Sequence, residues 1–153
     1  MVRKIMRSTH PFLFFSKKEK IRIVAAIQEA EEATSGEIRL RLERKFKGNG
    51  FIHAREVFER LVMTKTQERN AVLILFGLKN REFFILGDQG IDAKVPAGFW
   101  DSITQEMMTY FKEDRFSEGL AQGILKIGEK LKIYFPHQRE DRNELPDRIS
   151  YSL

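Results

Sequence analysis

The sequence predicts an α/β fold: a three-layer α-β-α sandwich in which helices cover both faces of a mixed, mostly four-stranded sheet. Ala71–Phe76 is an unbroken apolar run of strand length, which is typical of a strand covered on both faces. Glu37–Glu43 alternates apolar and charged residues with a period of two, the pattern of a strand. Around these strands lie segments with apolar residues at helical spacing, which predict the two outer layers.

The composition indicates one globular domain. The chain has 153 residues, of which 42% are apolar, and it contains no cysteine. Disulfides, thiolate zinc sites and cysteine nucleophiles are therefore excluded. The apolar run Pro11–Phe15 is shorter than a signal-peptide core, and no run approaches the roughly 20 apolar residues of a membrane span. We expect a cytoplasmic protein with no transmembrane segment.

The charges favour a mixed surface rather than a nucleic-acid site. The net charge is +5, but 22 acidic residues are interleaved with 27 basic ones. No dense basic run appears, so we expect no nucleic-acid partner. The three histidines, His10, His53 and His137, are too scattered to have metal-ligand spacing.

The domain is expected to span residues 16–135, preceded by an N-terminal arm of residues 1–15. We expect the phenylalanines of this arm to fold back onto the body. Ser16 and Glu19 match a capping box, which predicts a helix that runs to about Thr34. Four residues of this helix are predicted to share one stripe at helical spacing: Ile21, Val24, Ile27 and Glu31.

A strand–helix–strand unit follows. Glu37–Glu43 is predicted as a half-exposed strand, and residues 53–63 as a short helix with one apolar side. This order predicts a right-handed crossover that places Ile38–Leu42 parallel to Val72–Phe76. Turn residues then return the chain along Arg81–Leu86, antiparallel to the strand before it.

Two more helices are predicted before residue 136. The first carries apolar residues at helical spacing: Trp100, Ile103, Met107 and Phe111. The second begins near Ser117 and ends before Pro136. Three glycines in or near this second helix are expected to let a neighbouring element approach closely: Gly119, Gly123 and Gly128. The polar tail, residues 136–153, is expected to be loosely attached.

Several motifs resemble the TPM-domain family. They lie in the family's order over about residues 16–135: Ser35-Gly36-Glu37-Ile38, Arg69-Asn70-Ala71-Val72, Gly87-Asp88-Gln89-Gly90-Ile91 and Gly119-Leu120…Gly123-Ile124. The ending Asn143-Glu144-Leu145-Pro146-Asp147 is similar to the tail of short bacterial members without a signal peptide. The family includes chloroplast thylakoid-lumen proteins of photosystem repair and many bacterial proteins.

The resemblance carries expectations about fold and activity. It implies a mixed sheet between helices. Some members are described as acid phosphatases, and calcium binding has been attributed to others. Many relatives carry a signal peptide or a membrane anchor, which this sequence does not show. We therefore do not expect the lumenal and envelope roles to carry over.

The candidate site is the acidic loop Gly87–Asp92, which follows the second strand of the hairpin. Asp88 and Asp92 offer two carboxylates, and calcium or magnesium prefers oxygen ligands. Antiparallel pairing places Asn70 beside Asp88, and Glu37 completes the site if the strand ends are adjacent. We predict that these four residues hold calcium or magnesium (Ca2+ or Mg2+). A turn or helix cap is the alternative role of Asp88.

Two functions of different class follow from this site. The first is a regulatory or partner-binding module that binds a divalent cation, acts as a monomer and docks on a protein partner, for example a membrane-associated one. The second is a weak metal-dependent acid phosphatase for phosphate monoesters, which rests on the resemblance. For the cation site, we predict that Asp88→Asn abolishes the ion response and that Asp92→Asn only weakens it.

Overall fold

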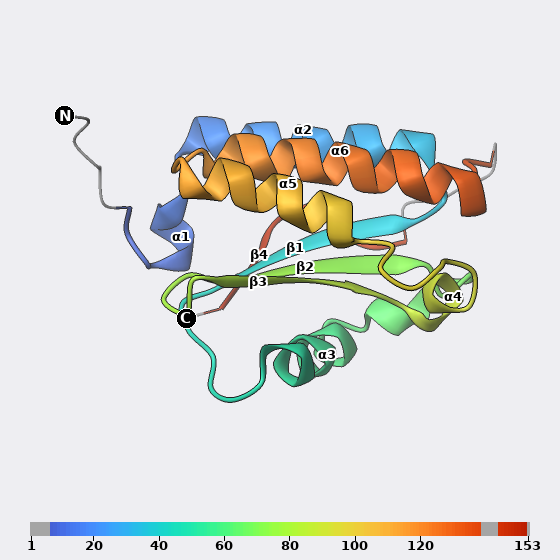
Figure 1. The fold of residues 1–153 in the computed structure, drawn as a ribbon, viewed down its shortest axis with the longest axis horizontal. Helices are drawn as coiled ribbons and strands as arrows, with labels where there is room; N and C mark the ends of the chain where they lie inside the picture. The colour runs from blue at the N-terminus through green and yellow to red at the C-terminus, as the bar shows by residue number, and fades with distance from the viewer. Residues whose placement is uncertain (1–6, 139–143, 153) are drawn as a thin grey trace.

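The computed structural model describes residues 7–138 and 144–152, and it confirms the α/β class. A four-stranded sheet of order β3-β2-β1-β4 lies between helices on both faces (Figure 1). Three long helices cover one face: α2 (Lys17–Ala33), α5 (Asp101–Lys112) and α6 (Phe116–Tyr134). The opposite face is covered by α3 (Gly50–Arg60). The short elements are α1 (Pro11–Phe14), the 3-10 helix η1 (Met63–Lys65) and α4 (Gln89–Asp92).

The central strands pair as predicted. β1 (Glu37–Glu43) runs parallel to β2 (Ala71–Gly77), with Ile38 opposite Val72. β3 (Glu82–Gly87) returns antiparallel to β2. These pairings confirm the predicted parallel arrangement of β1 and β2 and the predicted hairpin. The apolar run of β2 is buried along its whole length, as expected of a strand covered on both faces.

The fourth strand comes from the tail, which differs from the expected loose extension. β4 (Ser150–Ser152) pairs parallel with β1, and Arg41 lies opposite Ser150. Leu145 and Ile149, on either side of the turn before β4, are both buried. A strand of three residues is too short to show a period in sequence, which is why the pattern did not reveal it.

β1 is buried on both faces, so the prediction of a half-exposed strand is wrong. Its apolar side chains join the core under α2 and α6, while Glu37, Arg39 and Glu43 are also buried. On the second face, Glu43 contacts His53 of α3, and Glu37 accepts a hydrogen bond from the backbone N–H of Glu144 in the tail. Charged side chains on this strand therefore lie inside the protein, where each needs a partner.

Close helix packing confirms the use predicted for the glycines of α6. A methyl group at Gly123 would lie 2.5 Å from Sδ of Met107 in α5. A methyl group at Gly128 would lie 2.9 Å from Cα of Ala30 in α2.

The buried residues of α2 are Ile23, Ala26, Ile27 and Ala30. Ile21 is 62% exposed, so the predicted stripe is rotated from the true one.

The arm and the remaining helices also differ in detail from prediction. Phe14 and Phe15 of the arm are buried in the core as expected, whereas Phe12 is 48% exposed. α3 begins at Gly50 rather than at residue 53, because the Asn49 side chain accepts hydrogen bonds from two backbone N–H groups of its first turn. Within the described residues, no helix is long and apolar enough to cross a membrane.

Candidate functional site

The strand ends that carry the predicted site residues are adjacent. Glu37 begins β1 and lies opposite Ala71, the first residue of β2. The backbone N–H of Asp88 donates to the carbonyl oxygen of Ala71 at 2.9 Å. Glu37, Asn70 and Asp88 therefore meet at one end of the sheet, the end that carries α4 in Figure 1.

Asp88 is bound by an arginine at this end. Arg69 Nε and Nη2 donate to Asp88 Oδ2 and Oδ1, at 2.7 and 2.9 Å. The carboxylate also caps α4, because Oδ1 accepts the N–H of Gln89 at 2.8 Å. This is the helix-cap role named as the alternative for Asp88. Both oxygens have donors, so a cation here would compete with the Arg69 guanidinium.

The other residues of the predicted loop site lie apart from one another. Asp92 is exposed at the end of α4. The Asn70 amide donates to Ser35 Oγ at 3.2 Å and to Glu68 Oε2 at 3.3 Å. Its Oδ1 is buried and accepts no hydrogen bond. The structure thus brings Asn70 near the strand ends but directs its amide at Ser35 and Glu68.

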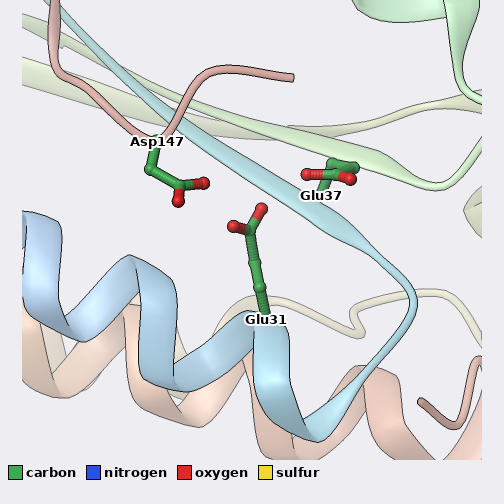
Figure 2. A group of neighbouring side chains, drawn as sticks. All are labelled: Glu31, Glu37 and Asp147. Carbon is green, nitrogen blue, oxygen red and sulfur yellow. The ribbon is translucent and has the colours of Figure 1, made fainter. Parts of the chain in front are cut away.

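Glu37 belongs to a different group of carboxylates. One oxygen of Glu37, one of Glu31 and one of Asp147 all lie within 4.8 Å of one another. Figure 2 shows Glu31 rising from α2 between Asp147 and Glu37. Glu37 is only 3% exposed, whereas Glu31 and Asp147 are half-buried, so the group is open on one side. We call these three residues the carboxylate cluster.

The turn between α2 and β1 positions two members of the carboxylate cluster. Thr34 ends α2, and its hydroxyl accepts the N–H of Gly36 at 3.1 Å. Gly36 allows Leu131 of α6 to pack closely against this segment, since a methyl group there would lie 3.0 Å from Cδ1 of Leu131. Glu31 then reaches over the turn, and its Oε2 accepts the N–H of Ile38 at 2.9 Å.

The tail supplies the third member. Asp147 lies three residues before β4, between the buried Leu145 and Ile149. The backbone N–H of Glu144 donates to Glu37 Oε1 at 2.7 Å. Since β4 pairs parallel with β1, these contacts hold Asp147 beside the start of β1.

Two oxygens of the carboxylate cluster are buried without a donor. They are Oε2 of Glu37 and Oδ1 of Asp147. Buried polar atoms normally have a hydrogen-bond partner, so an unpartnered carboxylate oxygen is costly. Burial raises the pKa of Glu31, and the carboxyls of Asp147 and Glu37 add to this shift. Burial also raises the pKa of Glu37. The arrangement requires a proton or a cation among the three groups.

Sequence reasoning named Glu37 but missed the other two members. Glu31 did carry a signal, because it was placed in an otherwise apolar stripe of its helix. A glutamate at a core-facing position needs a partner inside the protein. Asp147 carried no such signal, because its segment has neither helical nor strand periodicity.

A family model described as the TPM domain matches residues 13–130 of this chain. The chain belongs to the TPM-domain family. Among solved structures, the BA42 protein from the psychrophilic bacterium Bizionia argentinensis matches with a TM-score of 0.87 and 40% identity. That match covers 91% of this chain and 96% of BA42. A comparison with curated proteins finds no match.

A more distant structure shares the fold of this TPM domain. The N-terminal domain of a protein from P. gingivalis matches with a TM-score of 0.63 and 16% identity, over 82% of this chain and 83% of that one. At this identity the likeness concerns the fold alone. The sheet between helices is thus common to this chain and to both solved structures, in agreement with the sequence-based expectation.

Proposed function

We propose that this TPM domain binds a divalent cation, and that the cation is held by the carboxylate cluster. The single observation that carries the proposal is Glu37 Oε2, an oxygen of a 3% exposed side chain that has no donor. It lies in a group of three acidic side chains from α2, β1 and the tail. A cation would neutralise this group and supply the missing partner.

Calcium fits this group better than magnesium does. Calcium takes six to eight oxygen ligands at about 2.3–2.6 Å in irregular geometry, so two of its ligands can stand roughly 5 Å apart. Magnesium demands near-ideal octahedral geometry at about 2.0–2.1 Å. The three carboxylates come from separate segments of the chain and form an irregular ligand set, which calcium tolerates better than magnesium does. Water would fill the remaining ligand positions on the open side.

The proposal moves the cation from Asp88 to Glu37. Of the four residues predicted from sequence, Glu37 is in the carboxylate cluster, and Asp88 is paired with Arg69. Cation binding at Asp88, Asp92 and Asn70 stays a prediction. The variants Glu37→Gln and Asp88→Asn distinguish it from cation binding at Glu37. Docking on a protein partner and hydrolysis of phosphate monoesters also stay predictions.

Calorimetric titration with calcium tests the proposal. Wild-type protein should bind one calcium ion, and Glu37→Gln should abolish the heat of binding. The matched control is Glu32→Gln, an exposed glutamate on the same helix as Glu31. Equal binding by wild type and Glu37→Gln would overturn the assignment. The same variants can be assayed for hydrolysis of phosphate monoesters. If the cation takes part in that reaction, Glu37→Gln should abolish it.

A further inference from the structure

We propose that the end of the sheet opposite the carboxylate cluster docks on the surface of an anionic phospholipid membrane. The surface consists of two basic loops and the exposed apolar residues beside them. The first loop follows β1 and carries Arg44, Lys45 and Lys47. The second is the β2–β3 turn, which carries Lys79 and Arg81. We call these five residues the basic loop pair.

Hydrogen bonds hold the two loops together. The backbone N–H of Lys79 donates to the carbonyl oxygen of Arg44 at 2.8 Å. The Asn80 side chain accepts the N–H of Phe46 and donates to its carbonyl oxygen, both at 3.1 Å. Cations from residues 44–47 and 79–81 are thereby brought to one end of the fold (Figure 1). The two loops lie more than thirty positions apart in the sequence, so their basic residues do not form a dense run.

The basic loop pair is free to meet an external anion. All five side chains are exposed. In the described part of the chain, no ion pair involves any of them. Glu82 is the one acidic residue within 44–52 and 78–82. Five cations against one acid make these two loop segments strongly positive, although charges are mixed along the sequence.

Exposed apolar side chains lie directly beside the first loop. Phe51 and Ile52, in the first turn of α3, are 58% and 62% exposed. The Phe51 ring packs edge-on against Phe84 of β3 at 4.9 Å between ring centroids. This contact leaves more than half of Phe51 uncovered. These two adjacent large apolar residues at the start of α3 are available for insertion between lipid headgroups.

A second apolar pair lies at the same end of the sheet. Phe12 and Leu13 of α1 are 48% and 68% exposed. Phe12 stacks at 4.5 Å on Tyr151 of β4, which lies opposite Leu42 near the end of β1. This pair adds apolar surface to the end of the fold that carries the basic loop pair.

The combination favours a lipid surface over a nucleic acid. Basic residues near an anionic leaflet and apolar side chains at its boundary reinforce each other. Protein surfaces that bind single-stranded nucleic acid instead present aromatic rings on which bases stack. Of the four apolar residues, Ile52 and Leu13 have no aromatic face. No spanning helix is needed for such peripheral attachment.

The membrane surface is independent of the proposed cation site. Glu37 begins β1 and Glu43 ends it, and a strand of this length spans about 20 Å. Vesicle binding measured with a chelator present therefore reports on the basic loop pair alone. Loss of calcium binding in Glu37→Gln would leave vesicle binding unchanged.

Co-sedimentation of the full chain with vesicles, in low salt and EDTA, tests the proposal. The vesicles contain phosphatidylcholine alone, or phosphatidylcholine and phosphatidylglycerol in equal parts. Wild type should sediment with the second kind only. Each basic residue near an anionic leaflet contributes about a fivefold gain in binding. The double variant Lys45→Gln/Lys79→Gln should therefore bind about 25-fold more weakly.

Matched variants separate the surface from bulk charge and bulk hydrophobicity. Lys65→Gln/Lys132→Gln removes two exposed lysines outside the loops and should bind like wild type. Ile52→Asn should weaken binding, whereas Ile133→Asn, at a site that is 77% exposed on α6, should not. Equal losses in the paired variants would overturn the proposal. So would binding to a single-stranded oligonucleotide, but not to vesicles, through Lys45 and Lys79.

Discussion

Glu37 Oε1 accepts a hydrogen bond from the backbone N–H of Glu144 at 2.7 Å, across 107 positions of sequence. This contact joins the start of β1 to the tail and places Asp147 beside Glu31. The proposed cation site is therefore assembled from three separate segments. Cation affinity at this site should therefore require the tail to be docked on β1. The carboxylate cluster should affect the free energy of unfolding as well as cation binding.

Replacing Glu31 by glutamine should stabilise the protein when no divalent cation is present. Because the pKa of Glu31 is raised, the folded state keeps a proton that the unfolded chain releases above the ordinary pKa of 4.5. The free energy of unfolding of wild type therefore falls as pH rises above that value. Glutamine is neutral at every pH and keeps an acceptor for the Ile38 N–H. We expect a gain of roughly 1–3 kcal/mol near neutral pH.

Urea denaturation in EDTA measures this gain. The difference between Glu31→Gln and wild type should shrink as the pH is lowered below 4.5, where the unfolded wild-type chain also holds the proton. The control is Glu32→Gln, which is exposed and should match wild type. Destabilisation by Glu31→Gln at neutral pH would contradict the burial argument.

Calcium affinity should rise with pH. The cation and a proton compete for the same carboxylates, so binding releases protons. Calorimetry in two buffers of different ionisation enthalpy counts the protons released. Release of one proton would raise the affinity by up to about tenfold per pH unit between about pH 6 and about pH 8. Binding without proton release would mean that the cation occupies carboxylates other than Glu31 and Glu37.

Replacing Asp88 by asparagine should lower stability and leave calcium binding intact. Asparagine can still cap α4, but it cannot pair as an anion with Arg69. A lower urea midpoint with unchanged calcium affinity is the expected result. Loss of calcium binding in Asp88→Asn, with Asp92→Asn only weakened, would support the sequence-based site instead.

The ion pair between Arg7 and Glu19 should make stability fall in acid. Arg7 donates to both oxygens of Glu19, and these bonds lower the pKa of that carboxyl from 4.5 to about 2. The contribution is full above pH 4.5 and is lost as pH falls toward 2. We expect Glu19→Gln to cost about 1 kcal/mol at neutral pH and nothing at the acid end. A constant cost across this window would exclude the ion pair as its cause.

Replacing Gly128 by alanine should push α6 away from α2. The added methyl group would meet backbone atoms of Ala30, which cannot move as a side chain can. We expect a loss of about 1–3 kcal/mol. Since Ala30 precedes Glu31, calcium affinity should also fall. Thermal denaturation with and without calcium measures both effects. An unchanged melting temperature in Gly128→Ala would show that α2 and α6 can move apart without loss of stability.

The local elements of this fold were predictable because their patterns are local. The apolar run of β2, the capping box at Ser16 and the hairpin turn each occupy a few consecutive residues. The glycines of α6 likewise indicated close packing, although the sequence did not show which helices they contact. These features depend on backbone geometry and on burial, which short sequence patterns record.

The carboxylate cluster and the basic loop pair were not predictable, because each joins segments far apart in sequence. Asp147 reaches Glu37 only through β4, a strand of three residues. The second face of β1 is contacted by His53 of α3 and by Glu144 of the tail, and Glu144 follows the strand by about a hundred residues. Alternation in β1 was correctly taken as a strand, but no local pattern shows whether its second face is covered.

The most direct test of the central claim is a calcium titration followed by backbone amide chemical shifts. The account predicts saturable shifts centred on Glu31, Ile38 and Asp147, and their loss in Glu37→Gln. Shifts centred on Gly87–Asp92 that survive in Glu37→Gln and vanish in Asp88→Asn would contradict it.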